Sequence, residues 1–130
     1  MAITTYRDLE VYQRGMKALV AIHKLTLTFP DYERFDLADQ LRRASKSIPA
    51  NIAEGYGKRK SVKEFKRYLT IALGSANEAI VHLEIARELG YTSPDICNTL
   101  INDYDIIGKM LYRLIENWQT FPKKSSENGT

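Results

Sequence analysis

The sequence has little of the chemistry that builds disulfide-rich, metal-bound or membrane-spanning proteins. It contains a single cysteine, Cys97, among 130 residues, so the chain can form no internal disulfide and no thiolate cluster. It has no apolar run near the ~20 residues that span a bilayer, and its first residues lack the basic and apolar regions of a signal peptide. We therefore expect a reducing, cytoplasmic setting and no membrane partner.

Histidine is scarce as well, which argues against a metal centre. A di-iron bundle needs a Glu-x-x-His pair on each of two helices together with further glutamates. Here Glu78 and His82 are four residues apart, and the other histidine, His23, has no such partner. The sequence therefore predicts no metal site and no cofactor.

Positive charge is present, and it is concentrated in one part of the chain. The net charge is +3, but nine basic and two acidic residues lie between Arg42 and Arg67, a local charge of +7. The rest of the chain therefore carries −4. The basic residues of this segment are Arg42, Arg43, Lys46, Lys58, Arg59, Lys60, Lys63, Lys66 and Arg67.

Apolar residues recur at spacings of three and four in four segments, which predicts four amphipathic helices. The helices are expected from about Asp8 to Thr28, from near Phe35 to a C-cap at Gly55 and Gly57, from Ser61 to Leu89-Gly90, and from Thr92 through Trp118. The predicted buried stripes are Leu9, Tyr12, Met16, Leu19, Val20, His23 and Leu27; Leu37, Leu41, Ala44, Ile48 and Ile52; Phe65, Leu69, Ala72, Ala76, Ala79, Leu83 and Ala86; and Ile96, Leu100, Tyr104, Ile107, Leu111, Leu114 and Trp118.

The connections between these helices are short, and no stretch alternates convincingly with a period of two. The sequence thus predicts an all-α fold, an antiparallel up-down four-helix bundle. We expect a single domain over residues 1–121 and a flexible polar tail over residues 122–130.

Polar residues interrupt the apolar pattern where the second predicted helix approaches the third. Asn51 flanks a buried stripe, and a half-buried polar group needs partners. We hypothesise a polar network that fixes helix register and subunit assembly, with Ser47, Asn51, Glu54, Ser75 and Glu78 as its members. The alternative, an acid/base pair formed by the two carboxylates, is less favoured because no substrate-binding loop is evident. We therefore expect no enzymatic activity.

The third predicted helix carries a second, mixed track beside its buried stripe. This track consists of Ile71, Ser75, Glu78, His82, Ile85 and Leu89. It is either the edge of a wide core or a surface between subunits. Gly74 interrupts the same helix at a cost of about 1 kcal/mol relative to alanine, and we expect it to permit the close approach of a neighbouring helix. At the start of the helix, Ser61 and Glu64 have the spacing of a capping box.

The segment from Gln40 to Glu78 carries a distinctive combination of motifs. Asn51-Ile52-Ala53-Glu54-Gly55 is followed on the next helix by Gly74-Ser75-x-x-Glu78. With these motifs the chain resembles the bacterial 23S rRNA intervening-sequence proteins over nearly its whole length. The resemblance implies a left-handed four-helix bundle that assembles into a ring, typically a pentamer, and it implies no known activity. A distantly similar accessory protein of diversity-generating retroelements forms such a ring and binds nucleic acid and a reverse transcriptase.

The basic segment suggests a function for such a ring. Lysine and arginine bind a phosphate backbone by releasing its condensed counterions, and Tyr56 and Tyr68 could add stacking platforms for bases. The plainer interpretation is a solvated charged face, and GYGKRKS lacks the spacing of a Walker loop. We favour a homo-oligomer that binds RNA or DNA through this segment. The alternative is a scaffold that recruits a protein partner through a tyrosine-rich surface.

Overall fold

The computed structural model describes residues 2–118, which form four long helices and two short 3-10 turns. The elements are η1 (Tyr6–Asp8), α1 (Glu10–Thr26), η2 (Asp31–Glu33), α2 (Leu37–Gly57), α3 (Val62–Glu88) and α4 (Pro94–Asn117). The prediction of an all-α four-helix bundle is confirmed. The predicted tail, residues 122–130, lies outside the described residues.

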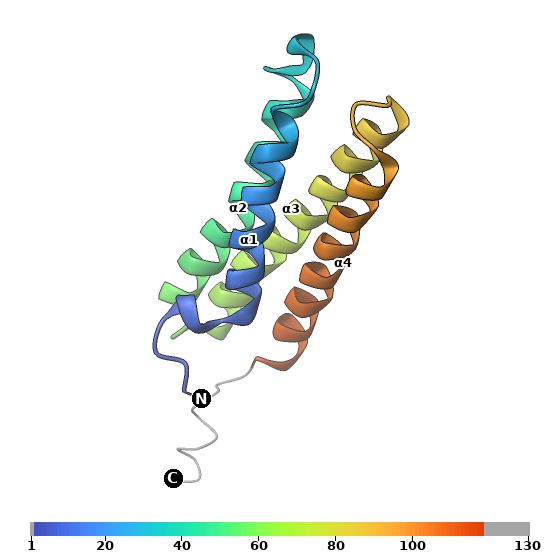
Figure 1. Cartoon of the computed structure of the whole chain (residues 1–130). Coiled ribbons are helices and arrows are strands. Elements are labelled where there is room, and N and C mark those ends of the chain that lie inside the picture. Colours follow the sequence, from blue (N-terminus) through green and yellow to red (C-terminus); the bar gives the residue numbers. More distant parts are fainter. Residues whose placement is uncertain (1, 119–130) are drawn as a thin grey trace, which may run out of the picture.

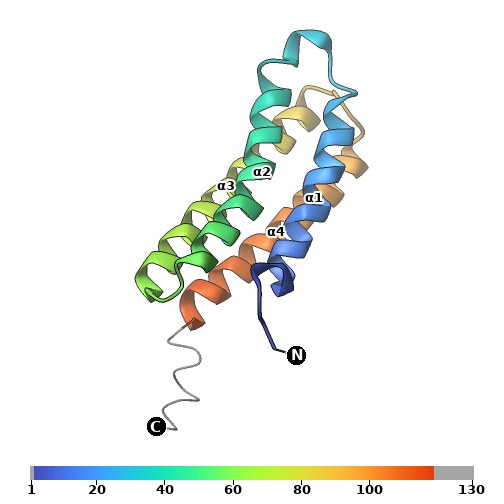
Figure 2. The same ribbon diagram turned by 90° about the vertical axis from the view of Figure 1, so that its left-hand side faces the viewer.

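The helices run alternately up and down along the bundle (Figures 1 and 2). Each packs on the next one along the chain, α4 packs back on α1, and the pairs α1/α3 and α2/α4 lie diagonally. The α2–α3 turn, the start of α1 and the end of α4 share one end of the bundle, whereas the α1–α2 and α3–α4 connections share the other.

Capping serines set the starts of α3 and α4. Ser61 Oγ accepts from the Glu64 amide at 3.1 Å, and Ser93 Oγ accepts from the Ile96 amide at 3.2 Å. The capping box also predicts that the Ser61 amide donates to the Glu64 side chain. It donates to the Lys58 carbonyl instead. At the far end of α3, Gly90 takes a φ of +74° and stops the helix, a conformation that favours glycine.

The buried stripes of α2 and α3 are those predicted, and every member is buried. In α1 most of the predicted stripe is wrong, although Leu9, just before the helix, is buried as predicted and Tyr12 packs against the core. The core face consists of Val11, Gly15, Ala18, Ile22 and Leu25. The predicted Met16, Val20 and Leu27 are 40%, 49% and 83% exposed.

The core face of α1 is rotated about the helix axis relative to the predicted stripe, and small residues on this face explain the rotation. A Cβ added at Gly15 would lie 3.3 Å from Cγ2 of Ile48, so the absence of a side chain lets α1 approach α2 closely. The large apolar residues are left outside. In α4 the predicted Leu100, Tyr104, Ile107 and Leu111 are buried, but Ile96 in the first turn is 50% exposed and the adjacent Cys97 is fully buried in its place.

Two glycines have roles other than those predicted. Neither Gly55 nor Gly57 takes the left-handed φ of the expected C-cap, and Lys58 follows the last residue of α2. A Cβ there would lie 2.7 Å from Cβ of Tyr68, so Gly55 is required for the contact between α2 and α3. Gly74 faces outward, and a Cβ there would meet nothing within 4 Å in the described part of the chain. The expected close approach at Gly74 is therefore not made within this bundle.

None of the helices between residues 2 and 118 is both long and apolar enough to cross a membrane.

Candidate nucleic-acid interface

Six of the nine predicted basic residues gather at the end of the bundle where α2 turns into α3. We call this group the basic turn; it consists of Lys58, Arg59, Lys60, Lys63, Lys66 and Arg67. All are exposed except Lys66, which is half-buried. Only Glu54 and Glu64 oppose them between residues 54 and 67, so the local charge is +4.

The remaining three basic residues lie elsewhere. Arg42, Arg43 and Lys46 occupy the first half of α2, about 20 Å from the turn along the helix axis. Arg43 pairs with Asp39 at 3.2 Å, and Arg42 turns toward α1. The predicted basic segment is therefore two separate surfaces.

Backbone hydrogen bonds hold the basic turn in one conformation. The Lys58 amide donates to the Gly55 carbonyl at 2.9 Å, the Arg59 amide to the Tyr56 carbonyl at 3.2 Å, and the Ser61 amide to the Lys58 carbonyl at 3.1 Å. With the Ser61 cap on α3, these bonds fix the cations relative to one another.

Aromatic rings beneath the turn orient its guanidinium groups. The Arg59 guanidinium lies 4.0 Å from the ring centroid of Tyr56, and it also donates to the Tyr56 carbonyl at 3.0 Å. The Arg67 guanidinium lies 4.5 Å from the ring centroid of Tyr68. Tyr56 is only 6% exposed, so it cannot stack on a base as expected, and it serves instead as a support for Arg59.

Ion pairing leaves most of this charge uncompensated. Arg67 pairs with Glu64 at 3.3 Å, and its hydrogen bond lowers the pKa of the Glu64 carboxyl. Within residues 2–118, none of the other five cations of the basic turn has a carboxylate partner within 4.0 Å. The turn thus presents five free positive charges to solvent.

The residues of the hypothesised polar network fall into three groups. Ser47 Oγ and Ser75 Oγ lie 2.8 Å apart across the α2–α3 contact, and Asn51 Nδ2 donates to the carbonyl and Oγ of Ser47 at 2.8 and 2.9 Å. Glu54 instead accepts from the Tyr68 hydroxyl at 3.2 Å. Glu78 lies 3.2 Å from His82 Nε2. The structure therefore joins three of the five residues and separates the two carboxylates.

Replacing Asn51 by alanine should lower the free energy of unfolding by about 1 kcal/mol, because two part-buried hydrogen bonds to Ser47 are lost. Urea denaturation followed by circular dichroism measures this change. The matched control is Asn77→Ala, since Asn77 is exposed on α3, and its effect should stay within about 0.5 kcal/mol. Equal effects of the two substitutions would show that the hydrogen bonds of Asn51 do not stabilise the fold.

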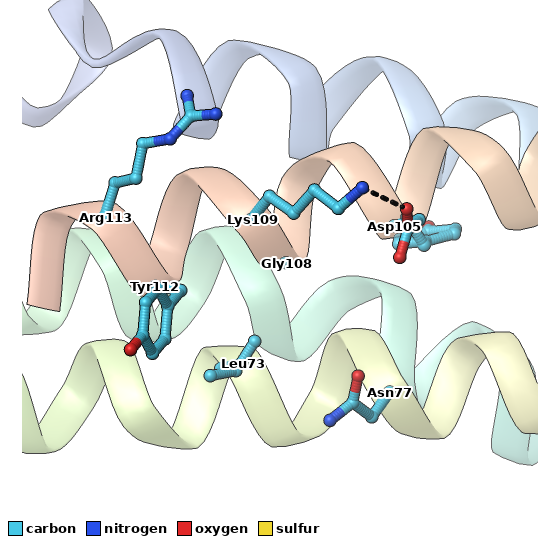
Figure 3. A pocket seen from close by; sticks show the side chains of 8 residues that line it. Leu73, Asn77, Asp105, Gly108, Lys109, Tyr112 and Arg113 are labelled. Atoms are coloured by element: carbon cyan, nitrogen blue, oxygen red, sulfur yellow. Dashed lines mark ion pairs between the residues drawn. The ribbon is translucent and has the colours of Figure 1, made fainter.

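A pocket lies between α3 and α4, but the charged side chains around it do not converge. This pocket of about 270 Å³ is lined in part by Leu73, Asn77 and Gly108. Figure 3 shows Lys109 extended along α4 to Asp105, with which it pairs at 3.1 Å, and Arg113 directed away from α3. The described residues also contain no group of three His, Cys, Asp or Glu side chains that could hold a metal ion.

Comparison with known proteins gives a family match and a structural match. The model of the 23S rRNA-intervening sequence protein family matches residues 7–113. A crystal structure of a protein of unknown function from the S23 ribosomal protein family of Bacteroides thetaiotaomicron VPI-5482 is 29% identical, with a TM-score of 0.75. The match covers 82% of this chain and 99% of that one. No curated protein matches the sequence.

Proposed function

The chain belongs to the 23S rRNA-intervening sequence protein family, and we propose that it is a non-catalytic homo-oligomer that binds the phosphate backbone of RNA or DNA. The observation that carries this proposal is the basic turn, with its five free cations on a hydrogen-bonded scaffold. Cations held in place lose little conformational freedom when they meet phosphates, and they gain by releasing condensed counterions.

The expected contact is to the backbone and not to base edges. The cations of the basic turn lie on the α2–α3 connection and on the first turns of α3, and α3 is packed against α2 and α4, so it is not a free recognition helix for a major groove. Anisotropy titrations with short fluorescent RNA and DNA, single- and double-stranded, test the proposal. We expect binding to each at low salt with little dependence on sequence. The absence of binding at low salt would show that the basic turn is only a solvated charged surface.

Oligomer formation is supported by two apolar faces on opposite sides of the bundle. The first is the α1 face, made of Met16, Val20 and Leu27; the second is the α3 face, made of Ile71, Val81 and Ile85. Because α1 and α3 lie diagonally, the α1 face of one copy and the α3 face of the next can form a head-to-tail contact. Contacts of this kind generate rings when the rotation closes.

Charge and backbone shape favour a second copy as the occupant of both faces. Residues 11–30 carry three basic and no acidic residues, whereas residues 78–88 carry three acidic residues and one basic residue. The outward-facing Gly74 lies within the α3 face and would let a neighbouring helix approach closely. The family resemblance adds the expectation of a pentamer.

Introducing a charge into the α3 face should dissociate the oligomer. Ile85→Glu would bury a carboxylate in the contact, so we expect the sedimentation coefficient to fall from that of an oligomer to that of a monomer. The control is Ile96→Glu on α4, which replaces another exposed isoleucine, 50% exposed against 38% for Ile85, outside both faces. A monomeric wild-type protein, or dissociation by both substitutions, would contradict this interface.

The alternative function, recruitment of a protein partner, is favoured by one observation. Tyr32 and Phe35 are 76% and 86% exposed at the α1–α2 connection, far from the basic turn. Aromatic side chains exposed in this way are typical of protein interfaces. Charge reversal at Lys58, Arg59 and Lys60 would abolish nucleic-acid binding and leave such a partner bound, so it separates the two functions.

A further inference from the structure

A cavity of about 560 Å³ lies at the opposite end of the bundle from the basic turn. It is bounded by the last turns of α1, the η2 connection and the first turns of α2. His23, Thr26, Arg34 and Arg42 line its polar part, and Phe29 and Pro30 line its apolar part. The cavity therefore combines cationic groups with an apolar wall.

Arg42 is the central cation of this cavity. It is half-buried. Its Nη1 donates to Thr26 Oγ1 and its Nη2 to the Arg34 carbonyl, both at 3.3 Å. A guanidinium has five N–H donors, so several remain for a ligand.

The positive charge of the cavity is not neutralised by ion pairs. Neither Arg34 nor Arg42 has a carboxylate within 4.0 Å among residues 2–118. Asp31 also lines the cavity, and in the same part of the chain it forms no ion pair with either arginine. A partly desolvated cation without a counter-charge favours an anionic ligand.

His23 adds a further polar group. Its Nδ1 lies 3.1 Å from the Leu19 carbonyl, which can only accept, so Nδ1 carries a hydrogen. Nε2 is then the acceptor nitrogen of the ring.

We propose that this cavity binds a small organic phosphate monoester. The planar Arg42 guanidinium matches the oxygen geometry of a phosphate, and the exposed Arg34, whose guanidinium lies 5.4 Å from the ring centroid of Phe35, adds positive charge to the lining. The cavity falls within the size range of small-molecule sites, and Phe29 and Pro30 supply an apolar wall for the organic group. The site is separate from the basic turn, so it does not depend on nucleic-acid binding.

Titration of the full-length ¹⁵N-labelled protein with adenosine 5′-monophosphate locates the ligand. We expect saturable chemical-shift changes at His23, Thr26 and the Arg42 side chain. Inorganic phosphate should give weaker changes at the same residues, and adenosine should give none. Changes confined to the basic turn, or no changes at millimolar ligand, would overturn the proposal.

Calorimetric titration of two neighbouring arginine variants then tests the charge requirement. Arg42→Gln should weaken binding of the monophosphate about tenfold or more, since a charged hydrogen-bonding group is lost. Arg43→Gln should change it less than about twofold, because Arg43 is exposed and pairs with Asp39 outside the cavity. Equal losses in both variants would contradict the site. If Arg42→Gln fails to fold, the chemical-shift changes of the unmodified protein decide whether the cavity binds the monophosphate.

Discussion

Reversal of two charges in the basic turn, by Lys60→Glu and Lys63→Glu, should lower the affinity for nucleic acid on the order of a hundredfold at low salt. Both lysines are exposed, and neither has a carboxylate partner in the described part of the chain. Each reversal removes a phosphate contact and adds a repulsive charge. A glutamate near the start of α3 also suits the helix dipole, so the fold should be kept. Anisotropy titration measures the change.

The matched control changes the net charge equally at another place. Lys46→Glu and Lys109→Glu replace two exposed lysines, one on the first half of α2 and one on α4. Lys46 belongs to the basic segment of the sequence, yet it lies about 18 Å from Lys58 along α2. We expect this variant to lose only a few-fold in affinity. Equal losses in the two variants would mean that binding follows net charge and not the basic turn.

Gly55→Ala should destabilise the protein by about 1–3 kcal/mol, although alanine is the better helix former. Its Cβ would lie 2.7 Å from Cβ of Tyr68 and 3.3 Å from the Phe65 carbonyl oxygen, and neither atom belongs to the flexible end of a side chain. The helices α2 and α3 would have to move apart just below the basic turn. Chemical denaturation gives the change in the free energy of unfolding.

Gly57→Ala is the natural control for this substitution. Gly57 ends the same helix two residues later, and a Cβ there would meet nothing within 4 Å among the described residues. It should be neutral or stabilising by up to about 1 kcal/mol, because alanine restricts the unfolded chain. Destabilisation by both substitutions would point to the backbone of the turn and not to the α2–α3 contact.

The sequence predicts the fold well because its local signals agree in most helices. Apolar spacing, a capping serine and a stop residue coincide in α3, apolar spacing and a capping serine coincide in α4, and α2, which has no side-chain cap, follows from apolar spacing alone. The helices and most of their buried faces therefore follow from the sequence. In α1 the signals conflict. Large apolar side chains such as Met16 and Val20 mark one face, but the close contact at Gly15 and Ala18 places the adjacent face inside. An analysis of apolar periodicity assigns the most hydrophobic residues to the core. It does not detect positions where small residues let two helices come into close contact.

The candidate site was only partly predictable for a related reason. Proximity in the sequence suggested one basic surface, but α2 is long enough to separate Arg42 from Lys58 by about 24 Å along its axis. The Ser47–Ser75 hydrogen bond was predictable, since the short turn fixes which residues of α2 and α3 face each other. The partners of Glu54 and Glu78 were not, because Tyr68 and His82 compete for them and rotamers decide the outcome.

The salt dependence of binding is the most direct test of the basic turn as a phosphate-binding surface. The logarithm of the association constant for single-stranded RNA should fall linearly with the logarithm of salt concentration, with a slope of about −0.7 for each phosphate contact. For the five free cations of the turn we predict a slope of about −3.5, and one shallower by about 1.4 after Lys60→Glu and Lys63→Glu. A slope near zero, or the same slope in both proteins, would contradict the account.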